Sequence, residues 1–196
     1  MAGVRDIPTA HTPPGGYGDE MPPPVLAGCD DPLIDGAPDL RGLWRTVDAR
    51  QGDDPLPDDS PMWGHVERVE QAWDRVVITS GGVIHDMVVD GTYEHGVNDV
   101  AGADFDTPIS VAASFEQGLL VLRPLGMPGV EVLRWREGIQ LVWSYRTLFT
   151  TWMERIDLEP EAEPEVDVEP DAPPMSPDDS VRLHGWVLPN DGTRDD

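Results

Sequence analysis

Between residues 40 and 157, short runs of β-branched and aromatic residues are separated by clusters of turn residues. The runs are too short for helices, and their apolar positions do not recur at helical spacing. Such a pattern predicts an all-β domain that contains many short strands. The expected strands are residues 42–49, 65–72, 75–80, 83–89, 92–98, 109–115, 119–123, 130–136, 139–145 and 149–156.

The turn residues indicate how these strands are connected. Asp90–Gly91, Gln117–Gly118 and Glu137–Gly138 each separate two apolar runs, and Gly81–Gly82 offers a further tight turn. Asp-Gly favours a two-residue hairpin because both central positions need a positive φ angle. Successive hairpins predict an antiparallel up-and-down meander of about eight to ten strands, which has exposed edges unless it closes into a barrel. A helix-free sandwich is the alternative architecture.

Two segments flank the predicted barrel domain of residues 40–157. Residues 1–39 are rich in proline and glycine, and they are expected to be mostly irregular and disordered because proline fixes φ and lacks an N–H donor. Their short apolar pieces, Val25–Ala27 and Pro32–Ile34, are candidates for docking on the barrel. Residues 158–196 form an acidic, proline-rich tail that is also expected to be disordered. The apolar end of this tail, Val181–Leu188, is either a docking motif or a frayed terminus.

The charge of the chain restricts its partners. The net charge is -25, and the 13 basic residues are all arginines. Contacts to nucleic acid or to an anionic membrane need clustered cations, so neither partner is expected. The single cysteine, Cys29, excludes an internal disulfide framework and a thiolate zinc site.

The expected location is the cytoplasm. The first residues lack the apolar stretch of a signal peptide. Apolar runs also stay well short of the ~20 residues that a membrane helix needs.

The first and last strands carry a family resemblance. Gly42 and Trp44 resemble the Gly-x-Trp signature on the first strand of lipocalins and other calycins, and Arg155 stands where these proteins often carry an arginine over that tryptophan. The resemblance implies that these three residues are structural and close one end of the barrel, with a cation–π contact of ~1 kcal/mol. Without a signal peptide or disulfide, the chain is most similar to intracellular lipocalin-like barrels. It also resembles small bacterial barrels that act as cyclases in natural-product pathways.

The hairpin expected around Asp90–Gly91 carries the first candidate for chemistry. Two-residue closure pairs Asp86 with His95 on the slightly more apolar face, which predicts that both point inward. A carboxylate that orients an imidazole is the usual arrangement of a general base, and a structural or surface pair is the alternative. A slip of one residue in register turns His85 and Glu94 inward instead. Since alternation sends neighbouring ligand types to opposite faces, no metal site is expected.

Arg134 and Trp143 share one face of the strands that meet at Glu137–Gly138, where Arg134 is expected opposite Leu141. If that face points inward, the arginine suits a ligand carboxylate beside an aromatic ring. The favoured alternative is that it points outward and pairs with surface acids. The candidate ligand-binding residues are His85, Tyr93, Glu94, Phe115, Arg134 and Trp143, and the candidate catalytic residues are Asp86, His95 and Tyr145.

These residues define the functional hypotheses. The sequence has no nucleophile motif, phosphate-binding glycine loop or dinucleotide fingerprint, and no cofactor is expected. The leading hypothesis is an intracellular lipocalin-like barrel that binds a small, largely apolar molecule, with one or two polar groups fixing its orientation. The alternative is a cofactor-independent cyclase or isomerase of natural-product intermediates on the same barrel. A third hypothesis is a protein-interaction module that uses the acidic tail. The oligomeric state is left open.

Overall fold

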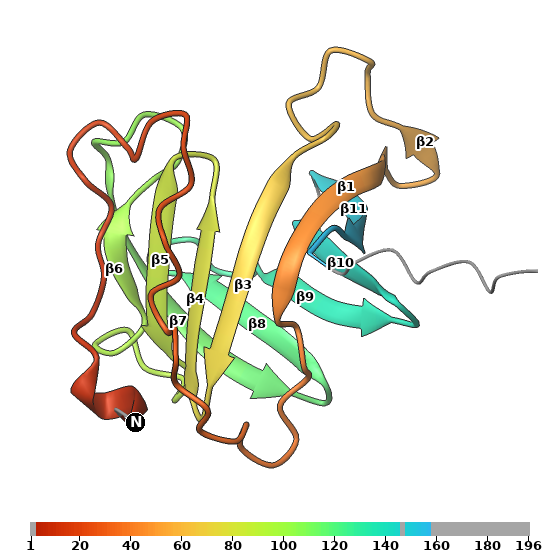
Figure 1. Ribbon diagram of the computed structural model, residues 1–196. Coiled ribbons are helices and arrows are strands. Elements are labelled where there is room, and N and C mark those ends of the chain that lie inside the picture. The colour runs from red at the N-terminus through yellow and green to blue at the C-terminus, as the bar shows by residue number, and fades with distance from the viewer. Residues whose placement is uncertain (1–2, 146–147, 158–196) are drawn as a thin grey trace, which may run out of the picture. The chain divides into compact units, whose positions relative to one another are not determined.

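The computed structural model describes residues 3–145 and 148–157 of the chain. A short 3-10 helix, η1, precedes a series of antiparallel strands (Figure 1). The elements are η1 (Val4–Asp6), β1 (Gly42–Gln51), β2 (Asp54–Pro55), β3 (Val66–Ala72), β4 (Arg75–Ser80), β5 (Val83–Val88), β6 (Val97–Val100), β7 (Pro108–Glu116), β8 (Leu119–Pro124), β9 (Val132–Glu137), β10 (Gln140–Tyr145) and β11 (Phe149–Arg155).

The strands form a nearly closed up-and-down barrel. Their hydrogen-bonded order is β5-β4-β3-β1-β11-β10-β9-β8-β7-β6, and the short β2 pairs with β1 outside this path. All the pairs are antiparallel, and the edge strands β5 and β6 lie next to each other. The predicted barrel is therefore confirmed in place of the sandwich, and the predicted strands are found close to their expected bounds, with one exception.

The exception is the hairpin that was expected to close at Asp90–Gly91. Residues 89–96 form a loop, and only residue 97 onwards enters a strand, so the predicted strand 92–98 is wrong. The Asp90 carboxylate accepts hydrogen bonds from the backbone and hydroxyl of Thr92, and Gly91 N donates to Ala113 O on β7 at 2.8 Å. These contacts turn the loop toward β7. One backbone bond, from Val88 N to His95 O at 2.8 Å, links it to β5.

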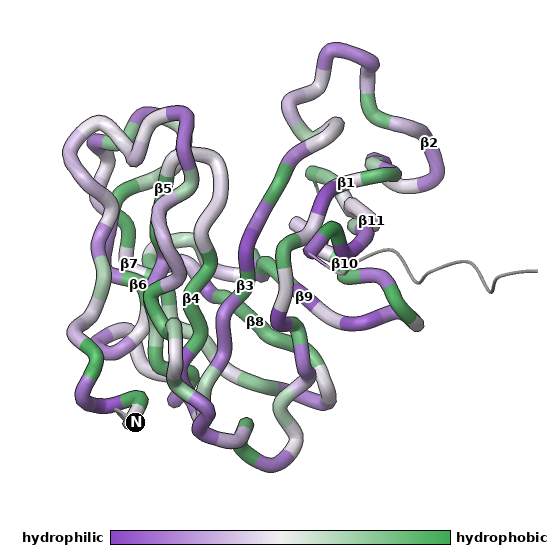
Figure 2. Tube along the Cα trace, viewed as in Figure 1, coloured by the Kyte–Doolittle hydropathy of each residue, from purple (hydrophilic) through white to green (hydrophobic). Residues whose placement is uncertain are grey.

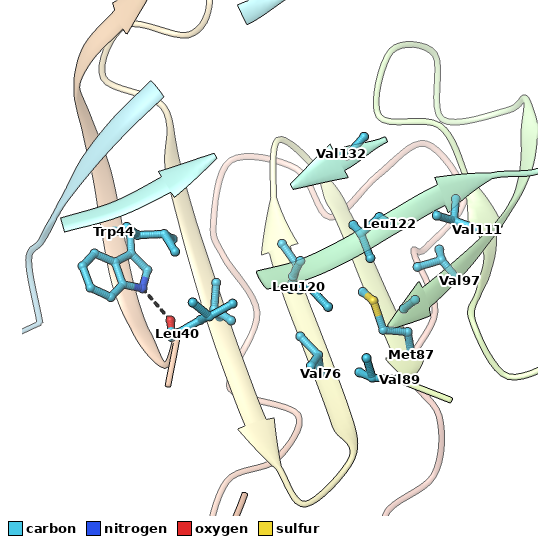
Figure 3. Packing of buried hydrophobic residues seen from close by; sticks show 14 of the residues in the cluster. Leu40, Trp44, Val76, Met87, Val89, Val97, Val111, Leu120, Leu122 and Val132 are labelled. Carbon is cyan, nitrogen blue, oxygen red and sulfur yellow. Dashed lines mark hydrogen bonds between the residues drawn. The ribbon is translucent and has the colours of Figure 1, made fainter. Parts of the chain in front are cut away.

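One apolar cluster lines the interior of the barrel (Figure 3). Leu40 and Trp44 are buried at the end of the barrel where β1 starts, and Trp44 Nε1 donates to Leu40 O at 2.9 Å. Ile109, Phe115, Trp143 and Tyr145 pack against this core but are only partly buried. The buried members of the cluster are Leu40, Trp44, Val69, Val76, Ile78, Met87, Val89, Val97, Val111, Ala113, Leu120, Leu122, Val132, Leu141 and Met153.

A second apolar cluster covers the outer face of β3, β4 and β5. It joins residues of these strands to the N-terminal segment, residues 3–41, which runs across them (Figure 1). Among the described residues, β4 is consequently buried on both faces, and Figure 2 shows its hydrophobic character. The cluster comprises Val4, Leu26, Ala72, Val77 and Ile84, with Ile7, Ala10, Tyr17, Val25 and Cys29 packed against it.

The described part of the N-terminal segment is mostly irregular and packs on the barrel, where disorder was expected. Side chains of the barrel supply the partners that a proline-rich chain cannot find within itself. The Glu70 carboxylate accepts hydrogen bonds from Val25 N and Leu26 N at 3.1 and 2.7 Å. Arg68 donates to Pro22 O at 2.7 Å. The contact of the apolar piece Val25–Ala27 with the barrel follows from these bonds.

Ile34 N donates to Trp73 O at 3.3 Å, so the piece Pro32–Ile34 also contacts the barrel. The predictions about the tail stay predictions, because residues 158–196 lie outside the described residues. In the part of the chain that the structure describes, no helix is long and apolar enough to cross a membrane.

Candidate functional site

The pairing of β4 with β5 decides which side chains enter the barrel. His85 lies opposite Ile78, and Met87 lies opposite Val76, whose side chains belong to the interior cluster. His85 and Met87 therefore point inward and Asp86 points outward, which corrects the predicted face. The predicted face is wrong because Ile84, an apolar residue on the same face as Asp86, packs in the outer cluster under the N-terminal segment.

Asp86 is the centre of a structural network on this outer face. Its carboxylate accepts two hydrogen bonds from Arg75, at 2.8 and 2.6 Å, and one from Ala10 N at 2.8 Å. Arg75 also donates to three backbone carbonyls of the N-terminal segment, Val4 O at 3.0 Å, Ile7 O at 2.7 Å and Pro8 O at 2.8 Å. The network joins β4, β5 and the N-terminal segment.

Arg75 and Asp86 are both buried, and the hydrogen bonds that Arg75 donates to Asp86 raise the pKa of Arg75. Arg75 was missed by sequence reasoning. The feature that could have indicated its role is the position of a cation at the start of an apolar strand, because a buried cation is unusual unless it is paired.

His95 pairs with Asp90 instead of Asp86. Its Nδ1 lies 2.6 Å from an Asp90 carboxylate oxygen, and the predicted Asp86–His95 pair is therefore wrong. The hydrogen bonds from His95 and Thr92 lower the pKa of Asp90 to about 2, and the same bond to Asp90 raises the pKa of His95. The imidazole is 55% exposed, so this is a surface pair.

The three candidate catalytic residues are not assembled into one group. Asp86 and His95 line the same cavity of about 410 Å³, between the N-terminal segment and the barrel, whereas Tyr145 does not line it. Tyr145 lies against the interior cluster instead, with its ring 6.1 Å from that of Phe149. Because Arg75 and Ala10 already occupy the Asp86 carboxylate, the cavity lacks the expected carboxylate–imidazole pair.

Arg134 points into the barrel, where Glu67 is its partner. The Nε and Nη2 groups of Arg134 donate to the two carboxylate oxygens of Glu67, each at 3.0 Å, and both residues are buried. The favoured outward orientation was wrong. The hairpin also turns one residue later than expected, so Arg134 lies opposite Trp143 rather than Leu141, a shift that preserves the face.

Trp143 lies beside this ion pair and joins it to His65. The Arg134 guanidinium lies 4.9 Å from the centre of the Trp143 ring, and the His65 ring lies 5.2 Å from the same ring. Thr46 N donates to His65 O at 2.9 Å, and the Thr46 side chain shares the inner face with Trp44. We call these five residues the inner polar cluster: Thr46, His65, Glu67, Arg134 and Trp143.

Three atoms of the inner polar cluster are buried without a hydrogen-bond partner. They are Thr46 Oγ1, His65 Nε2 and Trp143 Nε1. Burial lowers the pKa of His65, which favours its neutral form. Arg134 and Trp143 were predicted from the sequence, whereas Thr46, His65 and Glu67 were missed. The only feature that could have indicated these three is their position in or next to strands whose inner face was not known from the sequence.

The other ligand-binding candidates divide into two groups. His85 and Phe115 belong to the inner face, and the His85 Nε2 lies 3.1 Å from Val100 O, so its ring bridges β5 and β6. Burial lowers the pKa of His85. Tyr93 and Glu94 lie in the loop 89–96, exposed, and do not share the interior with the other candidates.

The three residues that resemble the calycin signature meet at the end of the barrel where β1 starts. Trp44 and Arg155 are opposite each other on β1 and β11. Gly42 has a φ of 144°, and a Cβ atom there would lie 2.7 Å from Arg155 Nε. The guanidinium over the Trp44 ring, at 4.8 Å, belongs to Arg136, so Arg155 packs on Gly42 and does not form the expected cation–π contact.

Among the described residues, no group of His, Cys, Asp and Glu is arranged to hold a metal ion. No family model matches the chain, and no curated protein matches it. One similar solved structure is titled Human cRBP IV; it is 13% identical, covers 60% of this chain and 98% of that chain, and has a TM-score of 0.46.

Proposed function

We propose that the barrel binds a small, largely apolar molecule in its interior, with the inner polar cluster holding the polar end of that molecule. The observation that carries the proposal is the set of three buried polar atoms without partners, Thr46 Oγ1, His65 Nε2 and Trp143 Nε1. Each such atom costs about 1–3 kcal/mol when nothing replaces its hydrogen bond to water. A ligand that supplies a partner recovers part of that cost.

The surroundings of the cluster support a ligand with an apolar body. The inner face is apolar over most strands, and burial of apolar ligand surface is the main source of affinity in such sites. Four apolar or aromatic side chains on this face remain partly exposed, namely Ile109, Phe115, Trp143 and Tyr145. Their uncovered surface is what an apolar ligand would bury.

The unpartnered atoms are buried, so a ligand reaches them only after a neighbouring side chain moves. His65 lies on Trp143 and comes from the segment before β3, outside the strands. Of the cluster members, it is therefore the one whose position depends least on the sheet. We expect its ring to shift when a ligand enters.

A neutral fluorescent probe, N-phenyl-1-naphthylamine, tests the proposal. We expect it to bind the full chain, to be displaced by dodecanol, and to bind about tenfold more weakly to Trp143→Phe, because about 1.4 kcal/mol of contact and hydrogen bonding is a factor of ten. Trp73→Phe is the matched control, since Trp73 is 48% exposed and belongs to neither apolar cluster. Absence of saturable binding, or an equal loss in both variants, would contradict the proposal.

A further inference from the structure

The Glu67–Arg134 pair gives the interior a particular charge balance. Glu67 is fully buried and Arg134 nearly so, and their bidentate contact leaves one positive and one negative charge side by side. The two histidines near Arg134, His65 and His85, have pKa values lowered by burial. Thus the ion pair and the two imidazoles together carry no net charge when both imidazoles are neutral. Arg136, on the same face of β9, lies over the Trp44 ring.

A carboxylate ligand fits this balance poorly. An arginine on the inner face would attract an anionic head group, but here Glu67 already occupies its Nε and Nη2 donors. An incoming carboxylate would add a second negative charge next to Glu67, and like charges repel strongly where water is excluded. The two Arg134 donors that face Glu67 are already used, which leaves fewer of the five N–H groups for a second carboxylate.

The unpartnered atoms instead fit a neutral head group. Trp143 Nε1 is only a donor, so the ligand must present an acceptor to it. Thr46 Oγ1 can donate or accept, and His65 Nε2 does either according to its tautomer. A hydroxyl or carbonyl oxygen can accept a hydrogen bond from Trp143 Nε1 without bringing a charge.

We propose that Glu67 sets the charge selectivity of the barrel interior: by neutralising Arg134 it excludes anionic head groups and leaves a site for an apolar molecule with a hydroxyl or carbonyl end. The inference rests on the proposed function, because it names the ligand class of the same interior site. Glu67 acts here through Arg134 and is a positioning residue.

Dodecanol and dodecanoic acid, which share a chain length and differ in head-group charge, test the proposal at pH 8 by displacement of N-phenyl-1-naphthylamine. The full chain is expected to bind the alcohol at least tenfold more tightly than the acid. In Glu67→Gln, which keeps the side-chain shape, Arg134 loses its counter-charge. The affinity for the acid should then rise at least tenfold, while the affinity for the alcohol changes by less than threefold.

A double variant, Glu67→Gln with Arg134→Gln, provides the control, because it removes both charges. The double variant should bind the alcohol with unchanged affinity and show no rise in affinity for the acid. If Glu67→Gln does not fold alone, refolding with each ligand is the measurement. The acid, which replaces the missing partner of Arg134, should restore folding where the alcohol does not.

The outcomes separate the two proposals. If neither ligand displaces the probe and the probe itself does not bind, the proposed function fails. If both ligands bind the full chain equally, or if Glu67→Gln gives the acid neither tighter binding nor a refolding advantage, the role of Glu67 is overturned while the binding function stands.

Discussion

Two buried arginine–carboxylate pairs lie on opposite faces of the same sheet. On the outer face, Arg75 uses all five of its N–H donors, two on Asp86 and three on carbonyls of the N-terminal segment. On the inner face, the bonds from Arg134 go to Glu67, and three polar atoms around the pair have no partner. The two pairs are alike in burial and charge, but they differ in whether the polar atoms around them have hydrogen-bond partners.

This difference separates a structural network from a candidate binding site. A saturated buried network holds elements together and leaves nothing for a ligand to contact. An incompletely satisfied one has a free-energy cost that a ligand can relieve. Burial of an ion pair alone does not tell the two apart, because Asp86 and Glu67 are both buried beside an arginine.

The largest expected effect comes from breaking the outer network. Arg75→Met should lower the free energy of unfolding by about 3–5 kcal/mol, because it leaves Asp86 buried without a counter-charge. Urea unfolding followed by circular dichroism measures the loss. Arg50→Met is the control, since its pair with Asp48 is exposed and such pairs contribute about 0–1 kcal/mol. Similar small losses in both variants would show that the outer network is not structural.

Two buried threonines allow the same comparison to be made for single hydrogen bonds, with and without a partner. Thr46→Val removes a hydroxyl without a partner and should raise the free energy of unfolding by about 1 kcal/mol. Thr151 is equally buried, but its hydroxyl donates to Trp143 O at 3.3 Å. Thr151→Val should therefore lower stability by about 1 kcal/mol. Losses of equal size in the two variants would mean that Thr46 Oγ1 has a partner after all.

The buried histidines give the interior a pH dependence. Burial lowers the pKa values of His65 and His85 below the ordinary 6.5, so the unfolded chain binds more protons than the folded one just below that pH. Stability should fall as the pH drops from 6.5 toward the folded pKa values and be fully present above 6.5. Urea titrations at several pH values above 5 measure this change in the free energy of unfolding. His85→Gln should flatten the dependence; an unchanged slope would argue against a buried neutral His85.

The smallest effect is expected at the exposed His95–Asp90 pair. Its bond raises the pKa of His95, so any stabilisation from this histidine is present below 6.5 and is lost as the pH rises through the folded pKa. Asp90→Asn should return the His95 pKa toward 6.5, measured by NMR titration of the imidazole. Because the pair is exposed, thermal stability should hardly change. An unshifted pKa in the variant would show that the pair does not persist in solution.

Local chemistry explains which parts of the fold were predictable. Strand positions and the turns at Gly81–Gly82, Gln117–Gly118 and near Glu137–Gly138 depend on residues close in sequence, and they were predicted. The loop 89–96 was not, because its path depends on a contact with Ala113 on β7. The face of β5 was mistaken because a distant segment, residues 3–41, buries its outer side as well.

The candidate site was predictable only in part for the same reason. Arg134 and Trp143 were recognised as neighbours on one face, since a short hairpin joins their strands. Glu67 is remote in sequence from Arg134, and only closure of the barrel brings the two together. Which buried atoms remain without a partner is a property of the assembled interior and cannot be read from strand periodicity.

The most direct test is an NMR titration of the tryptophan indole N–H signals with dodecanol. Trp143 Nε1 has no partner, whereas Trp44 Nε1 already donates to Leu40 O. We expect the Trp143 signal, assigned through Trp143→Phe, to shift saturably while the Trp44 signal stays in place. A Trp143 signal that does not move while dodecanol binds would show that the inner polar cluster does not hold the polar end of the ligand.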